Sequence, residues 1–421
     1  MQRRSRFLLI WAVALVVMLA LVAGFNAIIN PYELFAWQRI PGLNEYKPGT
    51  ENHTAMAKAY QIERARPVTV ILGTSRAYVA MDAANPVWPE ADRPVYNYGT
   101  PVSNMSEVLF RELRQAWGTG RLRHAVAILD VPAFLTPDPP LGRGPNQRRL
   151  LFLDDGKPNP DRRAQYLDDA FLSVMTMGAL VDSVKTVISR AGGDMVLDLR
   201  PDGTATAADF LNVARAEGMN ALFTQKDEYD LARIASFRQV FANWHGTMPN
   251  IGIVRDMIAF CLEHNVTLTL ILGSSHVDQM EIYRQAGLWP RIEQLKVDLA
   301  KLVADAHSDT ITAWDFVEYA PYTTEKVPPP GDRVTRMRWF WEPVHFQRAL
   351  GEIMLQRVFN GTPADFGAPL TVATVDARNQ VVRDQQRSFI GWRLACAATR
   401  PSTCSAPVNA LPVASTVAAD R

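Results

Sequence analysis

The chain has 421 residues and a formal net charge of +1, and its 48% hydrophobic and 21% charged content suits one large domain with an insertion, or two domains. The near-neutral charge, without a long basic run, excludes the usual signature of nucleic-acid binding. The seven histidines form no metal-ligand pattern such as HExxH, and no predicted strand is followed by GxGxxG. We therefore expect no metal, no nucleotide cofactor and no nucleic-acid partner.

Residues 1–30 predict a transmembrane signal anchor. Arg3, Arg4 and Arg6 precede an uncharged run of about 19 residues, 7–25, which at ~1.5 Å per helical residue nearly crosses a ~30 Å hydrocarbon layer. The positive-inside rule then places the rest of the chain outside the cytoplasmic (inner) membrane, in the periplasm. A cleaved signal peptide is the alternative, but its apolar region is usually shorter, and no A-x-A site follows this run.

After the anchor, residues 31–66 are rich in Pro, Gly and Asn and predict an irregular connector. Strand and helix patterns then alternate from residue 67 to residue 360. Short buried strands are predicted at 68–73, 95–99, 124–131, 266–273 and 310–316, and amphipathic helices at 106–117, 251–265, 289–306 and 343–359. Strands that alternate with helices and are buried on both faces indicate an α/β fold with a parallel sheet covered by helices.

The alternation is interrupted between about residues 132 and 245, where loop and helical patterns predict an inserted cap or partner-binding lobe. The tail, 361–421, has no clear period, and we expect it to be irregular. Within it, Cys396 and Cys404 are spaced for a small disulfide loop outside the cytoplasm, or they are two free thiols. Cys261 lies in an apolar helical pattern and is expected to be buried.

A serine stands where ligands bind in parallel α/β sheets, at the carboxyl end of a strand. Ser75 follows the strand at 68–73, and a helical pattern begins beside it, where backbone N–H groups favour negative charge. Glu342 and His345, at i and i+3 near the last helix, can orient an imidazole and supply a base. Each motif alone is weak, because such a serine is more often a helix cap. Together they predict a nucleophile, a base and an orienting carboxylate.

These segments resemble the SGNH, or GDSL-like, hydrolase superfamily. The resemblance rests on "ILGTSR", on "VYNYG" before a helix and on the late carboxylate-x-x-His, and it is closest to membrane-anchored bacterial members, which have segments similar to "FNAIINPYELF", "ILDVPAF" and "WEPVHFQRALGEIM". It spans roughly residues 25–360, although the insertion is not distinctive. It implies a three-layer α/β/α, flavodoxin-like domain outside the membrane. The implied activity is that of an esterase or O-acyltransferase, such as an O-acetyltransferase, on a cell-envelope glycan or polysaccharide, often beside a membrane-bound O-acyltransferase partner.

The resemblance also assigns roles residue by residue. Ser75 matches the nucleophile and His345 the base, and Glu342 stands where the family usually has Asp. For the oxyanion hole the chain offers Gly99, while the more usual glycine position holds Val102.

The family's third block usually supplies an asparagine to the oxyanion hole, but this chain has Asp130 there. Loss of one such donor typically costs about 10²–10³ in rate. Asn97 or Asn104 is a possible replacement donor. The alternative is a catalytically degenerate scaffold that binds a glycan or an O-acyltransferase partner.

Three further features are candidates for substrate contacts. Arg76, directly after the serine, either attracts an anionic substrate or pairs with a carboxylate. His276 follows the fourth strand and is expected at the rim of the site or behind it. The aromatic run 339–341, which ends in Trp341, forms either a sugar-stacking wall or part of the core.

Overall fold

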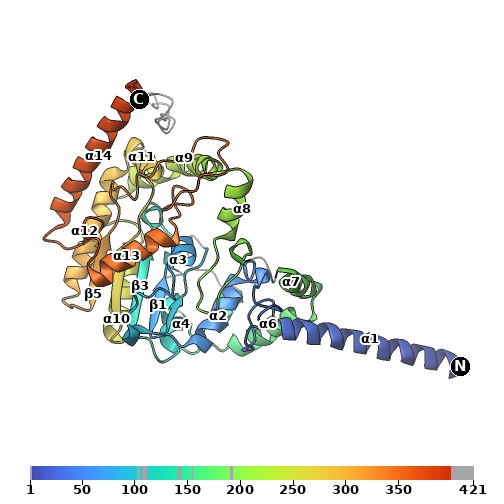
Figure 1. The fold of residues 1–421 in the computed structure, drawn as a ribbon. Coiled ribbons are helices and arrows are strands. Elements are labelled where there is room, and N and C mark those ends of the chain that lie inside the picture. The colour runs from blue at the N-terminus through green and yellow to red at the C-terminus, as the bar shows by residue number, and fades with distance from the viewer. Residues whose placement is uncertain are drawn as a thin grey trace, which may run out of the picture. The chain divides into compact units, whose positions relative to one another are not determined.

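The computed structural model describes residues 2–101, 105–106, 111–139, 145–153, 155–189 and 193–399. The chain divides into two compact units. The first unit comprises Met1–Pro67, Arg114–Arg121 and Gly142–Asp209, and the second comprises Val68–Leu113, Leu122–Leu141 and Phe210–Arg421. The elements of both units are labelled in Figure 1.

The second unit contains a six-stranded sheet in the order β2-β1-β3-β4-β5-β6. Its strands are β1 (Thr69–Leu72), β2 (Val95–Asn97), β3 (His124–Leu129), β4 (Thr267–Leu272), β5 (Ile311–Asp315) and β6 (Ala368–Pro369). The first five are parallel, and they are the five predicted strands; β6 was not predicted and pairs antiparallel with β5. Every residue of β1 and β3 is buried, which explains their continuous apolar sequences. The prediction of a mostly parallel α/β sheet is confirmed.

Helices connect these strands, and several match the predicted ranges. The helices of the second unit include α3 (Ser75–Ala80), α9 (Met219–Asn243), α10 (Ile251–Glu263), α11 (Val277–Gln285), α12 (Trp289–Asp305) and α13 (Arg348–Asn360). α4 (Glu112–Gly118) overlaps the range predicted at 106–117, and its residues from Arg114 onward belong to the first unit. The last of the predicted helices begins at Arg348 and not at 343, because a short turn bridged by Phe340 and Phe346 precedes it.

The predicted irregular tail is wrong for residues 375–399, which form α14 (Val375–Thr399). α14 packs against α12, and Arg378 forms ion pairs with Asp315 (3.2 Å) and Glu318 (2.9 Å). These pairs to distant parts of the chain stabilise a helix whose apolar residues follow only a weak helical period, so the sequence pattern did not predict it. Cys404 lies outside the described residues, and its disulfide with Cys396 stays a prediction. Cys261 is buried, as predicted.

The first unit joins two segments that the sequence suggested were separate. Its helices include α1 (Gln2–Ile29), α2 (Thr54–Ala65), α5 (Pro145–Arg148), α6 (Arg162–Met175) and α7 (Met177–Ile188), and α8 (Ala208–Ala216) begins at its end. The predicted connector, 31–66, therefore contains a helix and packs with 142–209 in one unit. The predicted insertion, 132–245, is not a single lobe, because residues from Phe210 onward belong to the second unit.

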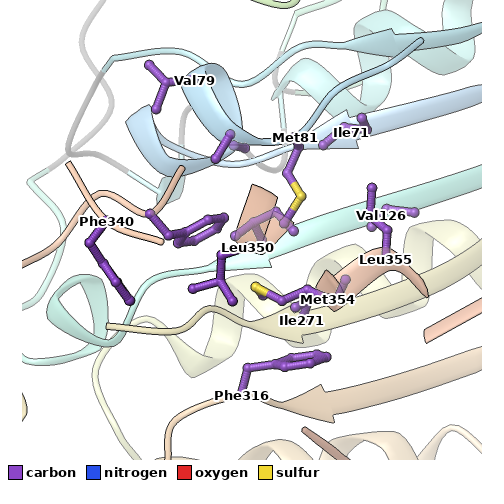
Figure 2. Close-up of a cluster of buried hydrophobic side chains, with 14 of the residues drawn as sticks. Ile71, Val79, Met81, Val126, Ile271, Phe316, Phe340, Leu350, Met354 and Leu355 are labelled. Carbon is purple, nitrogen blue, oxygen red and sulfur yellow. The ribbon is translucent and has the colours of Figure 1, made fainter. Parts of the chain in front are cut away.

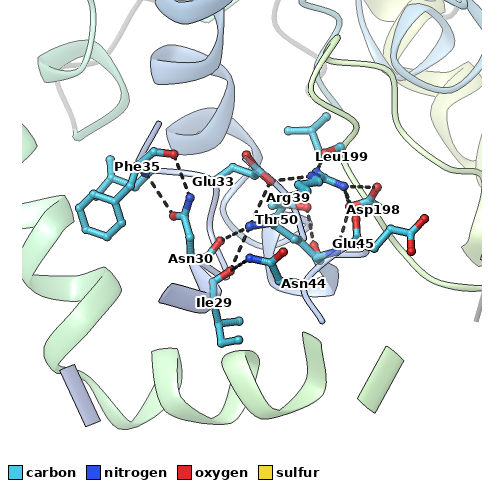
Figure 3. A network of polar contacts seen from close by, with 12 residues as sticks. Ile29, Asn30, Glu33, Phe35, Arg39, Asn44, Glu45, Thr50, Asp198 and Leu199 are labelled. Carbon is cyan, nitrogen blue, oxygen red and sulfur yellow. Dashed lines mark hydrogen bonds and ion pairs between the residues drawn. The ribbon is translucent and has the colours of Figure 1, made fainter. Parts of the chain in front are cut away.

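α1 is long and apolar enough to cross a membrane, and its residues 4–21 are all exposed. Whereas the N-terminal part of α1 is exposed, its C-terminal end is held by a buried network of polar side chains of the first unit (Figure 3). Lys47 Nζ donates to the carbonyl oxygen of Ile29 at 3.0 Å and lies 3.3 Å from Glu33. Arg39 joins Glu33 (2.7 Å) to Asp198 (2.8 Å). The last carbonyls of a helix lack intrahelical partners, so the network satisfies one of them and ties α1 to the unit.

The core of the second unit positions the segment before α13 against α3. Figure 2 shows α13 side chains, Leu350 among them, packed with Val79 and Met81 of the α3 segment and with side chains from the strands. A Cβ at Gly351 would meet the carbonyl oxygen of Ala80 at 2.4 Å. The backbones of α13 and α3 therefore touch at Gly351 and Ala80, where only glycine fits. This contact fixes α13, and the turn before it, against the helix that begins at Ser75.

Candidate active site

Ser75 lies at the carboxyl end of β1, as the sequence predicts. Gly73, with φ of +148°, turns the chain out of the strand, and Thr74 is the N-cap residue of α3. Ser75 is the first helical residue and not the cap. Its hydroxyl is therefore free of a capping role, and it is directed instead to a histidine.

His345 and Glu342 lie in the short turn that precedes α13. The turn is closed by backbone hydrogen bonds from Trp341 N–H to the carbonyl of His345 (2.9 Å) and from Gln347 N–H to the carbonyl of Trp339 (2.7 Å). Glu342 accepts the N–H of His345 at 2.8 Å through Oε1. The carboxylate therefore stabilises the backbone turn that presents the imidazole.

Ser75, His345 and Glu342 form a continuous hydrogen-bonded chain. The Oγ of Ser75 lies 2.7 Å from Nε2 of His345, and Nδ1 of the same ring bonds Oε1 of Glu342. Burial raises the pKa of Glu342, but the attraction of His345 outweighs it and the net shift is downward. An ionised Glu342 holds the Nδ1–H tautomer, which leaves Nε2 free to accept the serine proton. The predicted geometry is thus present.

A second polar group lies beside this one. Asp130, directly after β3, accepts a hydrogen bond from the hydroxyl of Thr74 and pairs with Nε of Arg76 at 3.1 Å. Arg76 is only 1% exposed and also donates to the carbonyl of Ser274 (2.9 Å) and to Gln279 (3.1 Å). Of the two roles considered for Arg76, the structure shows pairing with a carboxylate. The positive charge of the Arg76 guanidinium therefore offsets the negative charge of Asp130.

Two of the candidate oxyanion donors are occupied elsewhere. Asn97 is fully buried, and its Nδ2 donates to the carbonyls of Ala77 (2.7 Å) and Met81 (2.6 Å). The N–H of Gly99 donates to Oδ1 of Asn97 at 2.8 Å. Asn97 therefore stabilises α3 through two of its backbone carbonyls. The expectation that Asn97 and Gly99 donate to the reacting oxygen is wrong in this structure. The other two candidates, Val102 and Asn104, lie outside the described residues.

His276 is not part of the site. It is 1% exposed and caps α11, accepting the N–H of Asp278 at Nδ1 (3.2 Å) while Nε2 bonds the carbonyl of Glu325 (2.8 Å). Burial lowers its pKa, but Asp278 outweighs burial and the net shift is upward. Of the two positions expected for His276, the rim is wrong and the position behind the site is found: its backbone N–H donates to the carbonyl of Pro343 (2.9 Å), between Glu342 and His345.

The aromatic run 339–341 does not form one wall. Phe340 is buried in the core, and Trp339 packs edge-on against Tyr322. Only Trp341 lies near the histidine: it stacks on Phe210 (5.8 Å between centroids, 12° between planes), and the Phe210 ring lies 5.2 Å from that of His345. Phe210, which the sequence did not single out, completes this aromatic pair.

A pocket of about 270 Å³ opens beside the serine. Its wall includes Ser75 and His345 and all three members of the second polar group. It also includes four residues of α9, namely Lys226, Tyr229, Asp230 and Arg233. Sequence reasoning missed the α9 residues, although their spacing of three and four places them on one helical face. Lys226 lies 3.7 Å from Asp230 and 4.3 Å from the centre of the Tyr229 ring, so the charged side chains of α9 pair with one another. The same side chains give this wall of the pocket its hydrogen-bonding groups.

Among the residues that the structure describes, no group of three or more His, Cys, Asp and Glu side chains is arranged to hold a metal ion. Comparison of the chain with protein-family models, curated proteins and solved structures finds no match. Function must therefore be inferred from the geometry of this pocket. That geometry offers a hydroxyl nucleophile, a base within hydrogen-bond reach and a carboxylate behind the base, which is the arrangement used in acyl transfer through serine.

Proposed function

We propose that the chain is a membrane-anchored, extracytoplasmic serine esterase or O-acyltransferase with an SGNH-type, three-layer α/β/α domain. The observation that carries this proposal is the 2.7 Å contact between Ser75 Oγ and His345 Nε2, with Glu342 on the other ring nitrogen. The serine and the histidine are 270 positions apart in the chain, so the contact exists only because of the fold.

The reaction follows from these three residues. Ser75 Oγ attacks the ester carbonyl carbon while His345 Nε2 takes the hydroxyl proton. The bond to the leaving alcohol then breaks, and the imidazolium returns the proton to the alcohol oxygen, which leaves the acyl group on Ser75. Water or a sugar hydroxyl next attacks the acyl-serine and gives its proton to His345. The bond between the acyl group and Ser75 Oγ then breaks, and the imidazolium returns the proton to Oγ, which regenerates the serine. Glu342 stabilises the imidazolium in both halves.

The proposed substrate is an O-acylated glycan or polysaccharide of the cell envelope, and a membrane-bound O-acyltransferase is the proposed partner. The resemblance noted in the sequence motivates both. The polar face of α9 in the pocket supports a substrate rich in hydroxyl groups, and the Trp341–Phe210 pair beside His345 supports a ring-shaped one.

A catalytically inactive scaffold is the second candidate. It is favoured by Asp130 at the position of the expected asparagine and by the internal bonds of Asn97 and Gly99. A scaffold would bind a glycan or the O-acyltransferase without turning it over.

A fluorophosphonate probe distinguishes the two candidates on the full-length chain in lipid vesicles. An active serine enzyme is labelled at Ser75, which peptide mapping identifies, and labelling is lost in Ser75→Ala and in His345→Ala. A folded wild-type chain that takes up no probe would support the scaffold. Released acetate and acetylated acceptor, measured with O-acetylated envelope glycans, then separate hydrolysis from transfer.

We also propose that α1 stays attached and that the second unit lies in the periplasm. The arginines before the apolar run support the orientation. Retention is supported by the bond from Asn26 Nδ2 to the carbonyl of Val174 (3.0 Å), which cleavage near residue 28 would remove. N-terminal sequencing and a C-terminal alkaline phosphatase fusion test these points; a mature chain starting near residue 28, or an inactive reporter, would contradict them.

A further inference from the structure

α6 and α7 of the first unit pack against α1 near the end of its apolar run. The two helices are bent by 62° where they meet, and both contact α1. Asn26, in the last turn of α1, donates to the carbonyl of Val174 at 3.0 Å. Residues 7–21 of α1 are exposed and apolar. The α6–α7 pair, near the C-terminal end of α1 (Figure 1), therefore lies where a membrane-crossing α1 would leave the lipid.

The buried sides of α6 and α7 are mainly polar. The buried residues of α6 are Gln165, Asp169 and Ser173, and those of α7 are Ala179, Ser183 and Thr186. Asp169 accepts the hydroxyl of Tyr60 (2.8 Å) and Nε of Arg149 (2.7 Å). A helix of a water-soluble protein normally turns its apolar side inward, so these two helices are reversed.

The exposed sides are correspondingly apolar. Seven large side chains are between 40% and 73% exposed: Leu167, Phe171 and Met175 on α6, and Met177, Val181, Val184 and Ile188 on α7. Within each helix they are spaced by three or four residues and so form one stripe. Soluble proteins rarely expose continuous apolar patches of this kind unless something covers them.

We propose that the α6–α7 stripes insert into the interface of the lipid leaflet into which the C-terminal end of α1 leads. Two further observations favour lipid as the occupant. Both helices that carry the stripes pack against α1, whose apolar residues 7–21 are exposed. In addition, α6 and α7 have 14 and 12 residues, and at ~1.5 Å per residue neither can span a ~30 Å hydrocarbon layer.

This contact gives the first unit a fixed orientation on the membrane. A single transmembrane helix lets the attached unit tilt, whereas a second contact through a bent helix pair restricts it. The inference depends on α1 crossing a membrane but not on the proposed catalysis. Loss of probe labelling at Ser75 would leave it untouched, so the two proposals fail separately.

The test uses the full-length chain in phosphatidylcholine/phosphatidylglycerol vesicles. The three native cysteines are replaced by alanine, and one cysteine carrying the fluorophore NBD is introduced at Phe171 or Val181. The matched control is a label at Asp256, an exposed position on α10. Quenching is compared between lipids with a nitroxide near the headgroup and lipids with one near the chain end. Circular dichroism establishes that each labelled variant is folded.

Both stripe labels are expected to emit at shorter wavelength than the control and to be quenched most by the shallow nitroxide, as suits a depth of about 5–10 Å below the headgroups. Labels that behave like the Asp256 control would overturn the proposal. A blue shift without lipid quenching would also overturn it, because it would show that protein covers the stripes. Stronger quenching by the deep nitroxide would overturn the interfacial position in favour of a deeply inserted, re-entrant helix pair.

Discussion

Two groups of polar side chains lie at the start of α3, and each contains one hydroxyl and one carboxylate. In the first, the hydroxyl of Ser75 reaches a carboxylate through an imidazole, and His345 keeps 15% of its side chain exposed toward the pocket. Each link of this group can carry a proton, because neutral histidine has one donor and one acceptor nitrogen.

In the second group, the hydroxyl of Thr74 bonds the carboxylate of Asp130 directly, and the cation beside it is Arg76. A guanidinium has five donors and no acceptor, and it does not lose its charge in proteins. This group therefore holds β1, β3 and α3 together, and its only base is a carboxylate, which accepts a proton far less readily than an imidazole does. The adjacent hydroxyl residues Thr74 and Ser75 therefore have different roles. The basic side chain in each group, a guanidinium or an imidazole, decides which group is reactive.

The sharpest test of this difference is removal of one hydroxyl at a time. Ser75→Ala is expected to lower kcat by on the order of 10⁵–10⁶-fold, and His345→Ala by about as much, since nucleophile and base act as a unit. Thr74→Val, which removes the neighbouring hydroxyl and keeps its shape, should retain most of the activity. The activity of all three variants is measured by ester hydrolysis and by fluorophosphonate labelling. Equal losses in the Ser75 and Thr74 variants would abolish the distinction between the groups.

Glu342→Gln is expected to lower kcat by about 10⁴-fold, because an amide favours the wrong tautomer of the histidine. The substitution also changes stability with pH. The pKa of Glu342 in the folded chain is lowered by His345 despite burial. Its stabilising contribution is therefore complete above the unfolded pKa of about 4.3 and is lost as the pH falls through the lower folded value. Acid unfolding of the glutamine variant should lack this component, and an unchanged acid profile would argue against the charge pair.

Gly351→Val tests whether the core sets the distance between the serine and the histidine. Its side chain would collide with the backbone of Ala80, so α13 and the turn before it must shift. A displacement of about 1 Å can cost on the order of 10²-fold in rate. Gly252→Val, at a helical glycine with open space around it, is the control. Wild-type kcat in a folded Gly351→Val chain would show that the turn is positioned independently of the core.

Asp130→Asn affects the second group and should act on stability more than on rate. From the sequence, we expect this change to leave activity unchanged or raise it, because a negative charge near the oxyanion is removed. The structure adds that it leaves Arg76 buried without its carboxylate, a type of loss that typically costs ~3–5 kcal/mol. Thermal unfolding of this variant and of Asp130→Asn with Arg76→Met, which removes both charges, measures the pair. Similar melting of the single and double variants would show that the pair is not coupled.

Asp227→Asn should have the smallest effect, on the pH dependence of stability alone. Burial, followed by the negative charge of Asp278, raises the pKa of Asp227 to about 8; His276 opposes this shift, and Asp230 and Glu342 add to it. Between the unfolded pKa of about 3.9 and about 8, the folded chain holds a proton that the unfolded chain lacks.

Wild-type stability should therefore fall across this pH range as the pH rises. The Asp227→Asn variant should lose that slope, while Asp256→Asn, an exposed control, should keep it. Denaturant unfolding at several pH values measures the slope, and identical slopes in all three chains would refute the raised pKa.

The sequence by itself determined the elements that depend on local pattern. The five parallel strands are nearly continuous apolar runs that end at turn residues, and the apolar α1 is defined by length and lack of charge. The positions of Ser75, Glu342 and His345 could also be predicted, because a strand end and an i, i+3 spacing are local features.

Only the tertiary structure decided which polar residues are reactive and which are structural. Four residues at or just after strand ends look equally available in the sequence, namely Asn97, Gly99, Arg76 and His276. Each is engaged by partners from elsewhere in the chain or by a local cap. The polar residues of α9 reach the pocket because the core places that helix beside the sheet. Hydrogen-bond satisfaction depends on distant neighbours, and sequence spacing carries no record of them.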